Sequence, residues 1–108
     1  MTVFLVDSYV IKPDKLSEFT AFLKKYTERL KKRPDLTKEV KSHKIFSLML
    51  GGKGCEYVEM WEFENLAEFE KFFNRIMQDK EFTTTLNLES ARLIVPASES
   101  IEIWSSVP

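Results

Sequence analysis

The sequence predicts an α+β fold, in which one antiparallel sheet is covered by helices on a single face. Four short stretches have the β-branched and aromatic content of strands, and two longer stretches repeat apolar residues every three or four positions. A glycine-rich turn joins the middle two strands. In chain order these elements read β-α-β-β-α-β, with a short additional helix before the last strand. This is the split βαβ order of a ferredoxin-like sheet with its helices on one face.

The first strand is predicted over residues 2–11, where Val, Phe, Tyr and Ile dominate. Pro13 ends it, and an amphipathic helix follows that must stop near Pro34. The apolar side of this helix has spacings of three and four residues and is formed by Leu16, Phe19, Leu23, Tyr26 and Leu30. The polar residues 35–42 are expected to be irregular or partly helical.

A hairpin is predicted from strands over residues 43–50 and 55–63, joined by the turn at residues 51–54, Gly-Gly-Lys-Gly. These glycines do not predict a phosphate site, because a strand and not a helix N-terminus follows them. Asn65 is placed to cap the second helix, with Glu68 three residues later as in a capping box.

The region after the second helix predicts a short third helix that stops before Pro96, although three consecutive threonines weaken its helix propensity. The last strand is predicted over residues 99–107, with Ile101 and Ile103 on one face. No repeat or linker divides the chain, so all 108 residues are expected to form one domain, residues 1–108.

Composition limits the possible partners and the location. The formal net charge of −1 provides no basic field that would attract nucleic acid or an anionic membrane. The first apolar stretch is interrupted by Asp7 and is far too short to span a membrane. Cys55 is the only cysteine, so no intrachain disulfide can form, and no basic leader precedes the first strand. We therefore expect a cytoplasmic protein.

The strands are apolar on both faces, which predicts a partner for the sheet. One helix layer can cover only one face, and the other face of a monomer should be polar. In the first strand alone, alternating positions place Val3, Leu5 and Tyr9 on one face and Phe4, Val6 and Val10 on the other. An uncovered face of this kind exceeds the apolar patches of typical monomers, and a second copy on a two-fold axis is the simplest cover. The sequence predicts a homodimer, with higher assembly left open.

Two segments resemble known families. Residues 59–69, Glu-Met-Trp-Glu-Phe-Glu-Asn-Leu-Ala-Glu-Phe, resemble the strand end and capped helix start of the antibiotic biosynthesis monooxygenase-like and NIPSNAP-like families. Residues 79–82, Asp-Lys-Glu-Phe, resemble the D-x-x-F turn that follows that helix. The resemblance covers the element order of essentially the whole chain and implies the dimeric α+β barrel superfamily. It does not specify an activity, because this superfamily includes monooxygenases, decarboxylases, isomerases, haem-degrading enzymes and non-catalytic binding domains.

Asp7 and Glu59 are the candidate catalytic residues. Their strands, the first and the third, are central neighbours in a ferredoxin-like sheet, so the two carboxyl groups could share one face. Burial and a like charge nearby would raise the pKa of at least one of them, which suits acid or base catalysis. The alternative is that one or both point to a wet cleft or a dimer rim and have no chemical role.

Five further residues are candidate ligand contacts: Trp61, Tyr9, Tyr57, His43 and Arg92. Trp61 stands where the resembling families often place a pocket tryptophan, although a core role is also open. Arg92 could meet an anionic group of a substrate or could simply be a surface residue. His43 would need Asp7 and Glu59 to complete a metal site, and no local spacing groups them, so no metal is predicted.

The resemblance also implies that no cofactor is bound. Haem-degrading relatives supply a histidine from the third-helix region, and residues 80–95 contain none; those relatives carry an asparagine where this chain has Asp7. Quinone-forming monooxygenases of the family carry an asparagine where this chain has Tyr57. The leading hypothesis is a homodimeric small-molecule domain that acts as a cofactor-independent monooxygenase on an aromatic or polycyclic compound, with Trp61 as a wall of its pocket. The alternative is a non-catalytic ligand-binding or interaction module of NIPSNAP-like type.

Overall fold

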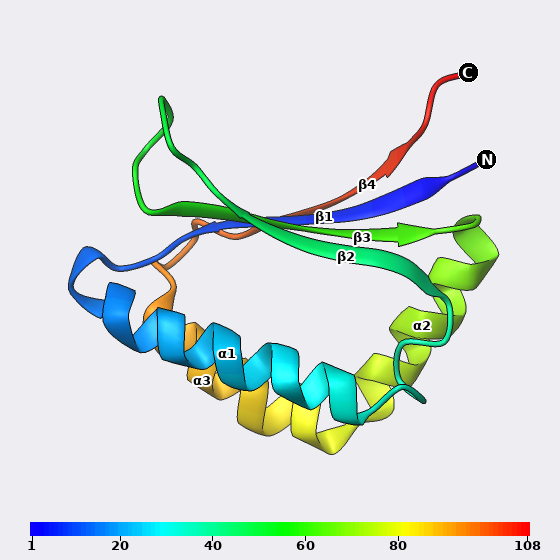
Figure 1. Cartoon of the computed structure of the whole chain (residues 1–108), viewed down its shortest axis with the longest axis horizontal. Helices are drawn as coiled ribbons and strands as arrows, with labels where there is room; N and C mark the ends of the chain where they lie inside the picture. Colours follow the sequence, from blue (N-terminus) through cyan, green and yellow to red (C-terminus); the bar gives the residue numbers. More distant parts are fainter.

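Four antiparallel strands form one sheet, in the order β2-β3-β1-β4, with every helix on the same face (Figure 1). The computed structural model describes all 108 residues. The strands are β1 (Val3–Val10), β2 (Val40–Ser47), β3 (Glu56–Phe63) and β4 (Ser100–Ser105). The helices are α1 (Leu16–Lys32), preceded by the 3₁₀ turn η1 (Pro13–Lys15), then α2 (Leu66–Gln78), the π-helix η2 (Glu81–Leu86) and α3 (Asn87–Leu93). The predicted ferredoxin-like βαββαβ fold is confirmed.

The helix boundaries follow from local chemistry. Three basic side chains in the last turn of α1 complement the negative end of its dipole, and Pro34 prevents the helix from continuing. Asn65 caps α2 as predicted, since its side-chain oxygen accepts a hydrogen bond from the Glu68 backbone N–H at 3.0 Å. None of the helices combines the length and the apolar character that crossing a membrane requires.

The predicted second strand, residues 43–50, is wrong at both ends. β2 begins at Val40 and stops at Ser47, so the apolar residues Met49 and Leu50 lie in the hairpin loop, where they are 93% and 89% exposed. Three glycines and Cys55 adopt positive φ in this loop, a backbone conformation that glycine tolerates without strain. The predicted last strand is also too long at each end, since β4 covers only Ser100–Ser105.

The third helix exists as predicted, but its first half is a π-helix. The Thr83 and Thr84 hydroxyls each bond back to a backbone carbonyl one turn earlier, of Asp79 and Lys80 respectively. Such bonds partly satisfy backbone groups in a segment of weak helix propensity. Of the residues of η2, Phe82 and Leu86 face the space between the helices and the sheet, and Thr84 and Thr85 are exposed.

The face covered by the helices carries two apolar clusters with a polar pair between them. The first cluster is Val3, Leu30, Trp61, Phe63 and Phe72, and the second is Tyr9, Ile11, Phe19 and Leu93. Along β1 and β3 the paired residues facing the helices are Val3 and Phe63, Leu5 and Trp61, Asp7 and Glu59, then Tyr9 and Tyr57. The carboxyl pair thus lies between two apolar regions on the covered face.

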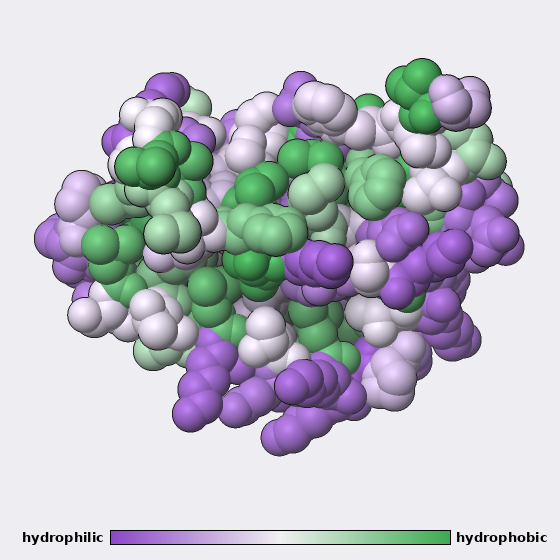
Figure 2. All heavy atoms as spheres, turned by 45° about the horizontal axis from the view of Figure 1, so that its top comes forward, coloured by the Kyte–Doolittle hydropathy of each residue, from purple (hydrophilic) through white to green (hydrophobic).

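The opposite face of the sheet has no helix over it and carries a band of apolar side chains among polar ones. Alternate residues of the central strands, among them Phe4, Val6 and Met60, point to this side. Phe46 of β2 and Trp104 of β4 are 46% and 57% exposed. Figure 2 shows the resulting band of hydrophobic side chains across the sheet.

Candidate functional site

A cavity of about 180 Å³ lies between the sheet and the helices α1, η2 and α3. Its sheet side carries Asp7 of β1, Glu59 of β3 and Glu99, which immediately precedes β4. Its helix side includes Tyr26 and Phe82. The lining contains no lysine, arginine or histidine. The site is therefore an acidic, aromatic-walled cavity at the polar interruption of the core.

Glu59 is held rigidly at the bottom of this site. Its side chain is 9% exposed, and both oxygens have partners. The Tyr9 hydroxyl donates to Oε2 at 2.9 Å, and His43 Nε2 lies 2.9 Å from Oε1. Burial, followed by the charge of Glu59, raises the pKa of Tyr9 above its ordinary value, so this phenol remains a neutral hydrogen-bond donor.

Asp7 is opposite Glu59 in the strand register, but it is not satisfied in the same way. Its Oδ1 atom is buried and has no hydrogen-bond partner. Burial raises the pKa of Asp7 to about 8, with further contributions from the hydrogen bond and charge of Glu99 and from the charge of Glu59. At neutral pH Asp7 is therefore mostly protonated, and it can give up or take a proton near physiological pH.

Trp61 lies outside the cavity, so the expectation that it forms a wall of the cavity is wrong. Its ring stacks on His43, with centroids 3.6 Å apart and planes at 15°, and also contacts Phe72 of α2. Trp61 shares a sheet face with Glu59 as expected, but two residues along β3 it has already entered the first apolar cluster. Its contribution is to hold His43 in place behind Glu59.

Of the four other candidate ligand contacts, only one lines the cavity. Tyr9 lines the cavity, and His43 reaches it only through Glu59. Tyr57 packs edge-on against Phe19, with centroids 4.7 Å apart, outside the cavity. Arg92 is on the outer surface of α3 with its side chain 70% exposed, which agrees with a surface role.

Sequence reasoning missed two residues that matter for the site. Glu99 has the same strand parity as Ile101 and Ile103, so pairing of the last strand with the first would have placed it near Asp7. Tyr26 was assigned only to the apolar stripe of the first helix, yet it lines the cavity, and burial first and the charge of Glu59 second raise its pKa well above the ordinary value. The phenol of Tyr26 thus adds a second neutral donor near Glu59.

No group of three His, Cys, Asp or Glu side chains is close enough to hold a metal ion. This includes the set of His43, Asp7 and Glu59 considered above. Glu59 uses its oxygens for Tyr9 and His43 and is not free to act as one of several converging ligands.

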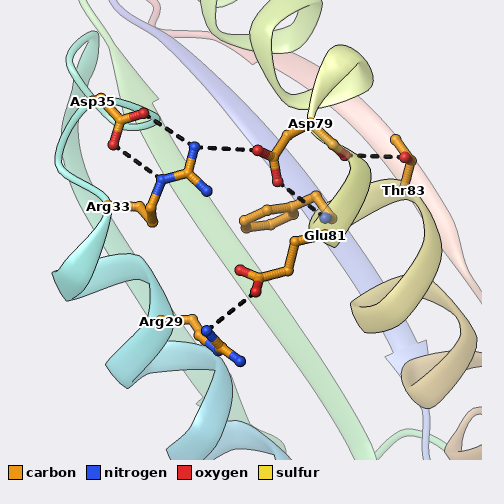
Figure 3. A network of polar contacts seen from close by, with 7 residues as sticks. Arg29, Arg33, Asp35, Asp79, Glu81 and Thr83 are labelled. Carbon is orange, nitrogen blue, oxygen red and sulfur yellow. Dashed lines mark hydrogen bonds and ion pairs between the residues drawn. The ribbon is translucent and has the colours of Figure 1, made fainter.

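A polar network fixes the end of α1 against the start of η2 (Figure 3). Arg33 bonds to Asp35 and also reaches Asp79 at 3.2 Å. The other Asp79 oxygen accepts from the Phe82 backbone N–H at 3.1 Å, which gives the D-x-x-F turn its physical basis. Arg29 pairs with Glu81 at 3.1 Å in the same view. These contacts hold the segment that carries the Phe82 ring into the cavity.

The comparisons with known proteins identify the fold. No protein-family model matches the sequence, and no curated protein matches it either. Among solved structures, an uncharacterized NIPSNAP-like domain protein from Burkholderia xenovorans matches with a TM-score of 0.73 and 16% identity, over 98% of this chain and 85% of that one.

Two further matches extend this finding. A dimeric protein of unknown function and ferredoxin-like fold from Bacteroides fragilis has a TM-score of 0.67 and 13% identity, covering 97% of this chain and 96% of that one. A structure described as an antibiotic biosynthesis monooxygenase has a TM-score of 0.66 and 15% identity, covering 98% and 99%. The chain thus shares its fold with the proteins that its sequence resembles. Identities this low establish the fold and leave the activity to the site.

Proposed function

We propose that this chain is a homodimeric domain that binds a small molecule in the cavity and exchanges a proton with it through Asp7. The observation that carries the proposal is the Asp7 carboxyl group, which has a buried, unpartnered oxygen and a pKa of about 8 in a cavity large enough for a ligand. Structural carboxyl groups in a core are normally fully hydrogen-bonded. A carboxyl group at a cavity wall with one oxygen free of hydrogen bonds is suited to accept a hydrogen bond from a bound ligand.

The two central carboxyl groups have different roles in this proposal. Glu59 is held by its hydrogen bonds with Tyr9 and His43 and forms a fixed polar wall of the cavity. Asp7 has a pKa near the working pH, the condition under which a carboxyl group transfers protons efficiently in either direction.

The reaction we favour is cofactor-independent oxygenation of a single-ring aromatic compound. An engineered apolar cavity of about 150 Å³ binds benzene, so a cavity of about 180 Å³ has room for one ring. Without a cofactor, the substrate itself must become electron-rich by losing a proton before it reacts with dioxygen. Asp7 is placed to take that proton in its ionised form, whose fraction grows as the pH approaches 8.

The competing function is a non-catalytic binding module of NIPSNAP-like type. The small size of the cavity and the match to a NIPSNAP-like domain favour it. In that case Asp7 contributes to ligand affinity alone. The two functions differ in whether removal of the Asp7 proton-transfer group changes a rate or only a binding constant.

The dimer forms, in this proposal, through the open face of the sheet. Phe46 and Trp104 are largely exposed there, beside the half-buried side chains of the central strands. A stable two-fold interface over this face would bury more than about 1,000 Å² in total. The cavity lies on the other face, so dimerisation leaves its lining intact.

The test combines binding and turnover. Single-ring aromatic compounds are screened by protein-observed NMR for shifts at Asp7, Tyr26 and Ser90, and each binder is then assayed for oxygen consumption. The catalytic proposal expects Asp7→Asn to lower turnover at least about 100-fold, within the range of general acid–base catalysis, while the dissociation constant changes by less than about threefold. Binding without turnover by the unmodified chain supports the module, and shifts confined to residues outside the cavity contradict both.

A further inference from the structure

The chemical character of the cavity lining specifies its ligand more closely than size does. We propose that the cavity takes a compact organic cation, a primary or substituted ammonium group carried on a single ring or a short apolar chain. This inference rests on the proposed small-molecule function and adds the charge of the ligand. Asp7, Glu59 and Glu99 provide three carboxyl groups on the sheet side, and no basic side chain lines the cavity to neutralise them.

The helix side supplies the second requirement, a continuous aromatic wall. The Phe22 and Tyr26 rings are stacked, with centroids 5.9 Å apart and planes at 9°. Phe19 continues the wall on one side at 6.2 Å from Phe22, and Phe82 continues it on the other at 6.0 Å from Tyr26. All four line the cavity. Aromatic faces attract ammonium groups, most strongly where water is excluded.

Two basic residues of α1, Lys25 and Arg29, form ion pairs outside the cavity. Lys25 of α1 pairs with Glu89 of α3 at 2.9 Å on the outer side of the two helices. Arg29 is paired with Glu81 in the same way. The positive charge that the inner carboxyl groups lack is thus not supplied by a rearranged side chain of the neighbouring helices. The buried Oδ1 of Asp7 is an independent sign that a donor is missing, since it is the one buried side-chain oxygen or nitrogen without a partner.

Binding of a cation in the cavity should also release the proton of the Asp7 carboxyl group to solvent. The groups that face Asp7 are Tyr9 on its own strand, Glu59 with His43 behind it, Glu99 before β4 and Tyr26 of α1. The residues that η2 and α3 add to the lining are uncharged. A positive charge among these groups favours ionised Asp7, so the cation displaces the Asp7 proton below pH 8. Affinity should therefore rise with pH up to about 8 and then level off.

The experiment uses three probes of nearly equal shape: benzylammonium, benzyl alcohol and benzoate. Calorimetry at pH 7, repeated in buffers of different ionisation enthalpy, gives both the affinity and the number of protons released. We expect benzylammonium to bind at least tenfold more tightly than benzyl alcohol, with release of a proton, and benzoate not to bind.

Two variants assign the effect to the cavity. Glu99→Gln removes one carboxylate from an exposed position at the cavity and should weaken benzylammonium about fivefold or more while benzyl alcohol is unaffected. Glu70→Gln makes the same change on the exposed side of α2 and should have no effect. Asp7→Asn should abolish the proton release.

The outcomes separate this inference from the function on which it rests. Benzyl alcohol binding as tightly as benzylammonium overturns the cation inference and leaves a small-molecule cavity. Equal weakening by Glu99→Gln and Glu70→Gln overturns it as well, because the attraction is then general and not local. Failure of all three probes to bind overturns both.

Discussion

Each of the two faces of the sheet carries, at one place, side chains whose polarity does not suit their surroundings. The covered face carries two carboxyl groups, Asp7 and Glu59, at its centre beneath the helices, where charge is costly. The open face carries Phe46 and Trp104 with nothing over them, where polar residues would be expected. In our proposals, the carboxyl groups of the covered face contact a ligand, and the apolar residues of the open face pack against a second copy of the chain.

The largest expected effect comes from the apolar part of the covered face. Phe63 is fully buried between α2 and the sheet, and its replacement by alanine should lower the free energy of unfolding by about 3–5 kcal/mol, measured by urea denaturation. Phe73→Ala, at a position of α2 that is 45% exposed, is the matched control and should cost less than half as much. Equal losses would contradict the assignment of the core to the covered face.

This comparison also shows how much of the structure the sequence could predict. The element order and the fold followed from periodicity, because alternation and helical spacing depend only on neighbours along the chain. Strand parity placed Asp7 and Glu59 on one face for the same reason. Strand parity does not show against which part of a strand each helix packs. Trp61 was therefore expected in the cavity, but in the structure it packs with Phe72 of α2 in the first apolar cluster.

The hairpin and the cavity boundary could not be predicted for related reasons. Met49 and Leu50 are as apolar as strand residues, yet β2 ends at Ser47 and both lie exposed in the hairpin loop. Glu99 and Tyr26 belong to the site through contacts between elements distant in sequence. A single sequence does not show which residues of the last strand pair with which residues of the first strand.

The next largest effect concerns pH and the polar centre of the covered face. The folded-state pKa of Asp7 is about 8, above the value of roughly 3.9 for an unfolded chain, so the unfolded state releases this proton first as pH rises. The contribution of Asp7 to stability is therefore complete below about pH 4 and is lost as the pH rises from about 4 to about 8.

Asp7→Asn isolates this contribution from the other titrating groups. The variant should be more stable than the unmodified chain at pH 9, with the difference shrinking steadily towards pH 5, as measured by urea denaturation at several pH values. Asp14→Asn, at an exposed carboxyl group in η1, should follow the unmodified chain throughout. A constant difference between Asp7→Asn and the unmodified chain would show that the Asp7 proton is not linked to folding.

A charged substitution at Trp104 tests whether the chain dimerises through the open face of the sheet. Trp104→Glu places a carboxylate in the apolar band and should weaken self-association at least about 100-fold without unfolding the chain, since the side chain is 57% exposed. Sedimentation velocity over a range of concentrations measures the shift. Leu88→Glu, at a 69% exposed position of α3, is the control and should leave the dimer intact. A chain that sediments as a monomer before any substitution refutes the proposed partner.

The smallest effect belongs to the ion pairs that join α1 to the following helices. Arg29→Gln removes the contact with Glu81 at the surface and should cost less than about 1 kcal/mol, an amount that declines further in high salt. Thermal unfolding at low and high ionic strength measures it. A loss of several kcal/mol would mean that the segment over the cavity depends on electrostatics more than on the packing of Phe82.

The measurement that tests the central claim most directly is a ¹³C NMR titration of the Asp7 side-chain carboxyl carbon. The claim is that the covered face contains a carboxyl group which burial and its neighbours Glu99 and Glu59 keep protonated at neutral pH. The account predicts a midpoint near pH 8 in the folded protein, with the resonance assigned by its loss in Asp7→Asn. A midpoint between pH 3 and 5 would contradict it, because Asp7 would then be an ordinary ionised carboxylate without a proton to exchange.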